Sequence, residues 1–234
     1  MDSTKTNPLR KQTFLSWSSG AWALHVLRQD PNTDVVGLFC TINKVLNRVV
    51  MHGVRVALLQ QQAESAGLPL HIIEIPHPCS KDEYASAMSV FVDLARKENI
   101  ECFAFGDLLL EDVRRYREDC LSRTGITPIF PLWGVPTKIL SRKIVAGGLK
   151  AVVTCIGPKR IPESFAGREY NDSFLDDLPD NIDPCGEYGE FHTFSFDGPI
   201  FQNPIDIVSG ETIYRDSFVF TDLLPLTSST ELIH

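Results

Sequence analysis

The fold is decided by the stretch Phe14-Leu15-Ser16-Trp17-Ser18-Ser19-Gly20-Ala21-Trp22-Ala23-Leu24-His25-Val26-Leu27. An apolar strand, a turn of small residues and an amphipathic helix follow one another in it. Small residues let the backbone approach an anion closely, and the free N–H groups of the next helix point at that anion. The stretch therefore predicts a phosphate-binding turn. It is not a Walker P-loop, because the second glycine and the following Lys-Ser/Thr are absent.

Strand and helix patterns alternate outward from this turn. The expected strands are residues 13–16, 34–41, 70–75, 102–105 and 151–156, and the expected helices are residues 21–29, 49–66, 81–98, 109–123 and 137–146. Ser80 and Glu83 predict a capping box for the third helix. Strands that alternate with helices of this length indicate βαβ units and a parallel sheet with right-handed crossovers.

After Gly157 the sequence changes in character, because prolines, glycines, acids and aromatic residues dominate it. We expect a short helix at residues 172–178 and strands at 191–196 and 211–220. The fold class predicted is α/β, a parallel sheet flanked by helices with a smaller C-terminal α+β subdomain. The expected division is a nucleotide-binding part at 12–157, a substrate-side part at 158–224 and a loose tail at 225–234.

Composition narrows the class of protein further. The 234 residues carry a net charge of −8, and nonspecific nucleic-acid binding needs a basic surface. The first eleven residues are polar, and no window approaches the roughly 20 apolar residues of a membrane helix. The six cysteines are scattered without a Cys-x-x-Cys pair, so a zinc or disulfide scaffold is not expected. We therefore expect a cytoplasmic protein that binds neither nucleic acid nor membrane.

Several polar and small residues are expected at the carboxyl ends of strands, where parallel sheets bind ligands near a reversal of strand order. The candidates for contact with a nucleotide are Ser16, Ser18, Ser19, Gly20, Thr41, Arg55, Gly106 and Asp107. A guanidinium at Arg55 suits phosphate. Structural alternatives remain open: a plain turn capped by serine, a strand end at Thr41, a surface arginine and a helix cap at Asp107.

The richest polar cluster is Glu187, Glu190 and His192. Glu190 and His192 lie two apart on an expected strand and so share one face. They are candidates for orienting an acyl group or ammonia, or for accepting a proton. The alternative is that they hold a glycine-rich loop through hydrogen bonds. No metal site is assigned, because no companion ligand spacing supports one.

The chain resembles the diphthine–ammonia ligase type of N-type ATP pyrophosphatases, the PP-loop or adenine nucleotide alpha-hydrolase-like proteins, from about Phe14 to Leu224. The most specific part is the segment Gly186-Glu187-Tyr188-Gly189-Glu190-Phe191-His192-Thr193 with Asp197-Gly198-Pro199 downstream. The other matching segments are Phe14–Gly20, Met51–Arg55, Phe105–Asp107, Phe130–Gly134 and Ala151–Cys155.

The resemblance implies a Rossmann-like fold and an ATP-dependent reaction. A carbonyl or carboxyl oxygen is adenylated, pyrophosphate leaves, and ammonia displaces AMP to give an amide. ATP and Mg²⁺ are the implied cofactors, and the acyl acceptor is not identified. One departure is clear: the family's turn continues Lys-Asp-Ser, whereas Ala21 follows Gly20 directly here. A nucleotide-binding or scaffold protein without catalysis is therefore the alternative hypothesis.

Overall fold

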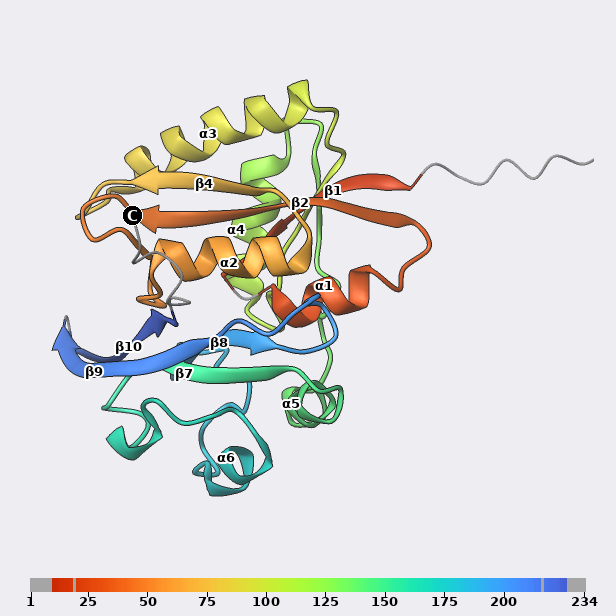
Figure 1. Ribbon diagram of the computed structural model, residues 1–234. Coiled ribbons are helices and arrows are strands. Elements are labelled where there is room, and N and C mark those ends of the chain that lie inside the picture. The colour runs from red at the N-terminus through yellow and green to blue at the C-terminus, as the bar shows by residue number, and fades with distance from the viewer. Residues whose placement is uncertain (1–9, 19, 216, 227–234) are drawn as a thin grey trace, which may run out of the picture.

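The computed structural model describes residues 10–18, 20–215 and 217–226, which form two β-sheets with helices around them (Figure 1). The first sheet has strand order β4-β2-β1-β5-β6, and all four of these neighbouring pairs are parallel. A short strand, β3, extends β2 in antiparallel fashion. The bounds are β1 Lys11–Ser16, β2 Thr33–Asn43, β3 Arg48–Val49, β4 Leu70–Ile75, β5 Cys102–Ala104 and β6 Thr127–Ile129.

The second sheet is antiparallel throughout, with strand order β8-β7-β10-β9. Its strands are β7 Lys150–Ile156, β8 Phe191–Asp197, β9 Ile207–Arg215 and β10 Phe218–Pro225. A parallel sheet flanked by helices with a separate antiparallel sheet toward the C-terminus confirms the predicted fold class.

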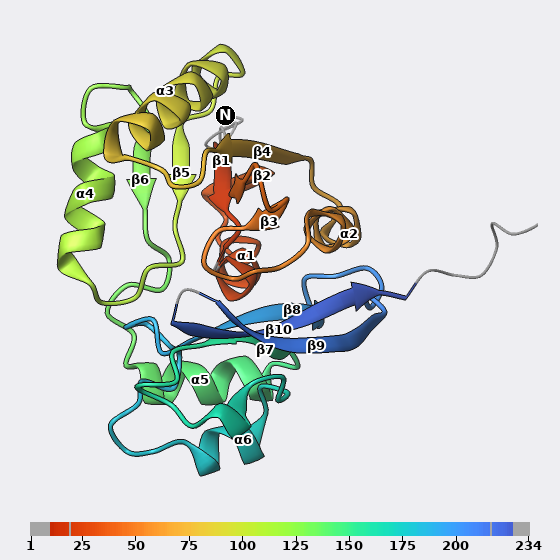
Figure 2. The same cartoon turned by 90° about the vertical axis from the view of Figure 1, so that its left-hand side faces the viewer.

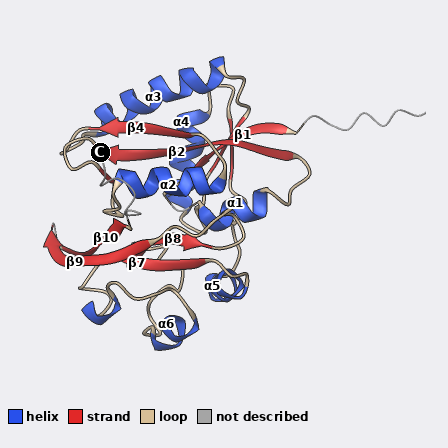
Figure 3. Cartoon of the chain, viewed as in Figure 1, coloured by secondary structure: helices blue, strands red, loops and turns tan. Residues whose placement is uncertain are grey.

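The helices make layers with the two sheets (Figures 2 and 3). Helices α1 (Ala21–Leu27) and α2 (Val56–Ala66) lie between the sheets, and α3 (Lys81–Lys97) and α4 (Glu111–Leu121) cover the other face of the first sheet. Helices α5 (Thr137–Ala146) and α6 (Asp172–Asp177), with a 3₁₀ turn at Glu163–Phe165, cover the far face of the second sheet. Each of the three interfaces is filled by its own cluster of buried apolar residues. No helix in the described part of the chain is long and apolar enough to span a bilayer.

Local signals placed most helix ends correctly. Ser80 and Glu83 form the predicted capping box at the start of α3, and Gly67 ends α2 in the left-handed conformation. The expected helix at 49–66 is wrong in its first part, because α2 begins at Val56. Met51 and Gly53 have φ values of 64° and 67°, which an α-helix cannot contain.

Two strand predictions are also corrected. Residues 151–156 do form a strand, but this strand, β7, pairs with β8 and β10 in the antiparallel sheet rather than in the parallel one. The single strand expected at 211–220 is the antiparallel pair β9 and β10. An apolar run indicates burial but does not specify a pairing partner. The division into 12–157, 158–224 and 225–234 stays a prediction, and most of that expected tail lies outside the described residues.

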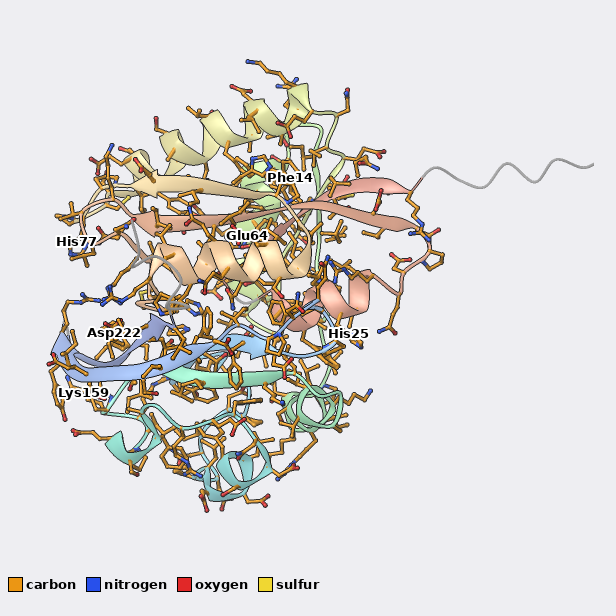
Figure 4. All side chains as sticks on the ribbon, viewed as in Figure 1. Phe14, His25, Glu64, His77, Lys159 and Asp222 are labelled. Carbon is orange, nitrogen blue, oxygen red and sulfur yellow. The ribbon has the colours of Figure 1, made fainter. Side chains whose placement is uncertain are left out.

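Two arginines, Arg48 on β3 and Arg55 at the start of α2, join the two sheets through one carboxylate on β10. The Arg48 Nη1 group donates to Asp222 Oδ1 at 2.7 Å, and Arg55 donates to both Asp222 oxygens at 3.1 and 2.6 Å. Asp222 lies between α2 and the second sheet (Figure 4). Burial acts to raise the pKa of Asp222, but the hydrogen bonds from Arg55 and Arg48 hold it below its ordinary value.

We expect Asp222→Asn to lower the free energy of unfolding by about 1–2 kcal/mol, because two guanidinium groups lose their anion while partial exposure screens them. Urea denaturation at pH 7 measures this, with the exposed Asp180→Asn as the control. Equal stability of the two variants would contradict the importance of this contact.

Candidate functional site

A cavity of about 430 Å³ lies where the parallel sheet meets the antiparallel one. The chain leaves β1 toward β2 on one side and later returns to place β5 on the other side of β1. The carboxyl ends of β1 and β5 therefore flank a topological switch point, where open α/β sheets bind ligands. The opposite wall comes from β8 and the loop before it.

Seven of the predicted site residues line this cavity, and three others do not. Ser18, Gly20, Thr41, Gly106, Asp107, Glu187 and His192 are among its lining residues. Ser16, Arg55 and Glu190 are not, and Ser19 lies outside the described residues. Four parts of the chain, at Gly20, Thr41, Asp107 and Glu187, thus meet at one cavity. What each residue does there stays a prediction.

The turn after β1 is compact. A Cβ added to Gly20 would collide with the Ser16 carbonyl oxygen and approach the Leu15 side chain to 3.2 Å. Glycine is therefore required at this position by close packing of the turn on its own strand. Among the described residues, no side chain caps α1, and Gly20 provides its backbone N-cap.

A buried chain of hydrogen bonds ties this turn to the second sheet. Trp17 Nε1 donates to Gln62 Oε1 at 2.8 Å, and Gln62 Nε2 donates to the Ser195 carbonyl oxygen at 2.6 Å. All three residues are buried and line the cavity. We call this chain the layer bridge. Sequence reasoning missed Gln62, although a glutamine among the apolar positions of α2 was a visible signal.

Glu187 joins the glycine-rich loop to the segment after β5. Its Oε1 atom accepts from the backbone N–H groups of Leu108 and Leu109 at 2.8 and 3.2 Å. Burial raises the pKa of Glu187, and the nearby carboxylates of Asp107 and Asp183 add to this effect against those two hydrogen bonds. The carboxylate thus closes the cavity at the end of β5.

Asp107 is held by an arginine from α4. Arg117 Nε donates to Asp107 Oδ2 at 3.1 Å, and the Arg117 guanidinium lies 4.5 Å from the centre of the Phe105 ring. Both members of the pair line the cavity. Arg117 was not singled out from the sequence, because it stands in a run of charged residues that is typical of a solvated helix face.

Glu190 and Arg55 have other partners. Glu190 is 2% exposed, and it accepts from the N–H groups of Tyr188 and Asp183 at 3.0 and 3.4 Å. It therefore stabilises the loop in which Gly186 and Gly189 adopt positive φ. Arg55 is bound to Asp222. The geometry of both residues supports the structural alternative over contact with a ligand in this cavity.

Two histidine rings pack against each other at the wall formed by β8, tilted by 41°. The rings of His52 and His192 are 4.5 Å apart, and His52 Nδ1 lies 3.4 Å from the Thr193 carbonyl oxygen. In the described part of the chain, His192 Nε2 is a buried atom without a hydrogen-bond partner. Burial lowers the pKa of His52 to about 3, with a contribution from His192, and lowers the pKa of His192 to about 4. Both rings are therefore neutral at pH 7.

The fold and the cavity define an α/β protein with a cavity at the carboxyl edge of a parallel sheet. Comparison with known proteins narrows this class. Residues 136–224 match the family model described as "Diphthamide synthase C-terminal domain". That range holds β7, the glycine-rich loop and most of the second sheet, so the C-terminal part of the resemblance is confirmed.

Similarity to individual curated proteins agrees with the family model. The chain is 26% identical to diphthine–ammonia ligase of Mus musculus, over 64% of this chain and 58% of the relative. The Homo sapiens protein is 24% identical, over 66% of this chain and 60% of the relative. The Danio rerio protein is 26% identical, over 68% of this chain and 68% of the relative. The chain thus spans about three fifths of the mouse and human relatives. It is distantly similar to diphthine–ammonia ligases.

We expect Gln62→Leu to lower the free energy of unfolding by about 2–4 kcal/mol, because it leaves the Trp17 N–H and the Ser195 carbonyl buried without partners. Gln60→Leu, at an exposed position of the same helix, is the matched control. Thermal and urea denaturation measure both, and a loss no larger than that of the control would show that the layer bridge is dispensable.

Acid should destabilise the protein through the two histidines. Their folded-state pKa values lie below the ordinary value of 6.5, so between pH 6.5 and about 4 the unfolded chain binds more protons than the folded one. The full stability is present above pH 6.5. Below that pH, each histidine lowers the free energy of unfolding by at most about 1.4 kcal/mol per pH unit.

Urea denaturation between pH 7.5 and 5 tests this linkage. The double variant His52→Gln/His192→Gln should lose less stability over that range than the wild type, whereas His77→Gln should match the wild type. Parallel pH profiles for wild type and double variant would contradict the assignment.

Proposed function

We propose that the cavity binds an adenine nucleotide and serves an ATP-dependent amide-forming reaction. The observation that carries the proposal is that Ser18 and Gly20, the pair Gly106–Asp107, and Glu187 with His192 all line one switch-point cavity. The similar mouse, human and zebrafish proteins are named diphthine–ammonia ligases, which supports the class of reaction. The acyl acceptor of this chain is left open.

The reaction proposed has two steps. An acyl oxygen attacks the α-phosphorus of ATP, and pyrophosphate leaves with the electron pair of the broken P–O bond. Ammonia then attacks the acyl carbon, AMP leaves, and the nitrogen gives up a proton to form the neutral amide. Acyl adenylates hydrolyse readily, so a cavity that limits the access of water would protect the intermediate.

The described residues support distinct roles for the two walls. Gly106 and the turn before α1 would lie against the nucleotide, where small residues permit close approach. Glu187 and His192 would face the acyl group and ammonia. A pKa of about 4 makes His192 a weak base, so its unpartnered Nε2 atom suits a hydrogen bond to substrate better than proton uptake.

Magnesium is implied by ATP chemistry, but the described residues do not offer it a ready site. No group of three or more His, Cys, Asp or Glu side chains is arranged to hold an ion there. The cavity carboxylates Asp107 and Glu187 are already bound to Arg117 and to two backbone N–H groups. We therefore place Mg²⁺ with the phosphates of ATP and assign it no protein step.

A second candidate function is nucleotide binding without turnover. The specific observation in its favour is the turn itself, where Ala21 follows Gly20 and the Lys-Asp-Ser of related turns is missing. A lysine in that position would offset phosphate charge, and its absence removes a source of transition-state stabilisation.

Incubation with Mg·ATP, ammonium chloride and a panel of carboxylic acids should release AMP and pyrophosphate in equal amounts, measured by chromatography and a coupled pyrophosphate assay. Glu187→Gln should slow this release at least about tenfold if its charge acts in the reaction. ADP and phosphate as products would refute the ligase chemistry.

Nucleotide binding without any product would favour the second candidate. Insertion of Lys-Asp-Ser between Gly20 and Ala21 separates the two cases, because restored turnover in that variant locates the deficit in the turn.

A further inference from the structure

The cavity has few positive charges with which to hold a polyphosphate. Among the lining residues that the structure describes, Arg117 is the only lysine or arginine, and its guanidinium is bound to Asp107. Asp107 and Glu187 supply two carboxylates to the same lining. The permanent charges of the described cavity wall therefore favour negative potential or, at most, neutrality.

The two histidines of the cavity wall add no positive charge to it. His52 and His192 are packed against each other in the wall of β8, and both are neutral at pH 7. Protonating either ring would place a charge in a buried position without a carboxylate partner, which is costly. They therefore do not offset the phosphate charge of a ligand.

One pair of backbone donors in the cavity wall is also occupied. Consecutive N–H groups at the end of a strand often hold a phosphate, and Leu108 with Leu109 provides such a pair after β5. In this chain Glu187 Oε1 accepts from both groups. A phosphate oxygen would have to displace that carboxylate and then lie next to it, and like charges repel strongly where water is excluded.

The rest of the lining suits an uncharged, partly aromatic ligand. Trp17, Trp22, Tyr170, Phe191 and Phe194 contribute to the walls, and the volume of about 430 Å³ lies within the range of small-molecule sites. Polar contacts are available from the Ser18 and Thr41 side chains. These features match a nucleoside better than its triphosphate.

We infer that this cavity selects adenosine, or an adenylate with a single charge, over ATP, because its described lining holds two carboxylates and a single arginine that is already paired. The inference rests on the proposed adenine-nucleotide site and narrows its ligand class. In the proposed reaction the cavity would then bind the acyl-adenylate intermediate more tightly than it binds ATP.

Isothermal titration calorimetry on the full chain at pH 7.5 tests the selectivity with four probes: adenosine, AMP, ATP and Mg·ATP. We expect adenosine to bind at least about tenfold more tightly than ATP, with AMP between them. Raising the salt from 50 to 500 mM should strengthen ATP binding by screening the repulsion and should leave adenosine binding nearly unchanged. This salt comparison needs no variant.

Glu187→Gln tests the source of the selectivity. The glutamine side-chain oxygen can still accept from Leu108 and Leu109, but the charge is gone, so the ratio of ATP affinity to adenosine affinity should rise about fivefold. Glu98→Gln, an exposed residue at the end of α3, should keep the wild-type ratio. A circular dichroism melt confirms that each variant is folded.

The outcomes separate the two proposals. Tighter binding of ATP than of adenosine, or a wild-type ratio in folded Glu187→Gln, would overturn the selectivity while the nucleotide site stands. Binding of none of the four probes would overturn the nucleotide site and the selectivity with it. Adenosine binding that weakens with each added phosphate supports both.

Discussion

The structure depends on the contact between two sheets of different kinds through the layer that holds α1 and α2. Apolar packing fills most of this interface, but it does not fix the orientation of one sheet relative to the other. Two sets of polar contacts fix that orientation: the layer bridge through Gln62 and the binding of Asp222 by Arg48 and Arg55. Because a buried donor or acceptor without its partner is costly, these contacts fix how the sheets face each other, and that arrangement shapes the cavity.

The cavity has the position of a nucleotide site and an unusual charge balance for one. Its place at the switch point follows from the strand order, in which β1 lies between β2 and β5. Its charge follows from Asp107, Glu187 and Arg117, whose contacts with one another and with backbone N–H groups leave little for a phosphate chain. Distant similarity to diphthine–ammonia ligases and a cavity better suited to a nucleoside are compatible if the adenylate is the species that this wall holds best.

Sequence reasoning named several residues that meet at this cavity and others whose contacts lie elsewhere. Strand ends predicted that the turn at Gly20 and the pair Gly106–Asp107 would converge, because parallel strands end at one edge of a sheet. Arg55 and Glu190 are polar residues within the same motifs, yet the structure gives them a structural partner each, Asp222 and the glycine-rich loop. The sequence spacing of a carboxylate or guanidinium does not reveal which of several possible partners it meets.

The sequence by itself determined the local elements: the strand–turn–helix at residues 14–27, the capping box at Ser80 and the left-handed end of α2 at Gly67. Each depends on a few neighbouring residues, so nearby side chains suffice to specify it. Only the tertiary structure decided that β7 joins the antiparallel sheet and that Gln62 spans the two layers. Those outcomes depend on pairings between segments far apart in the chain, where burial of one surface against another outweighs local preference.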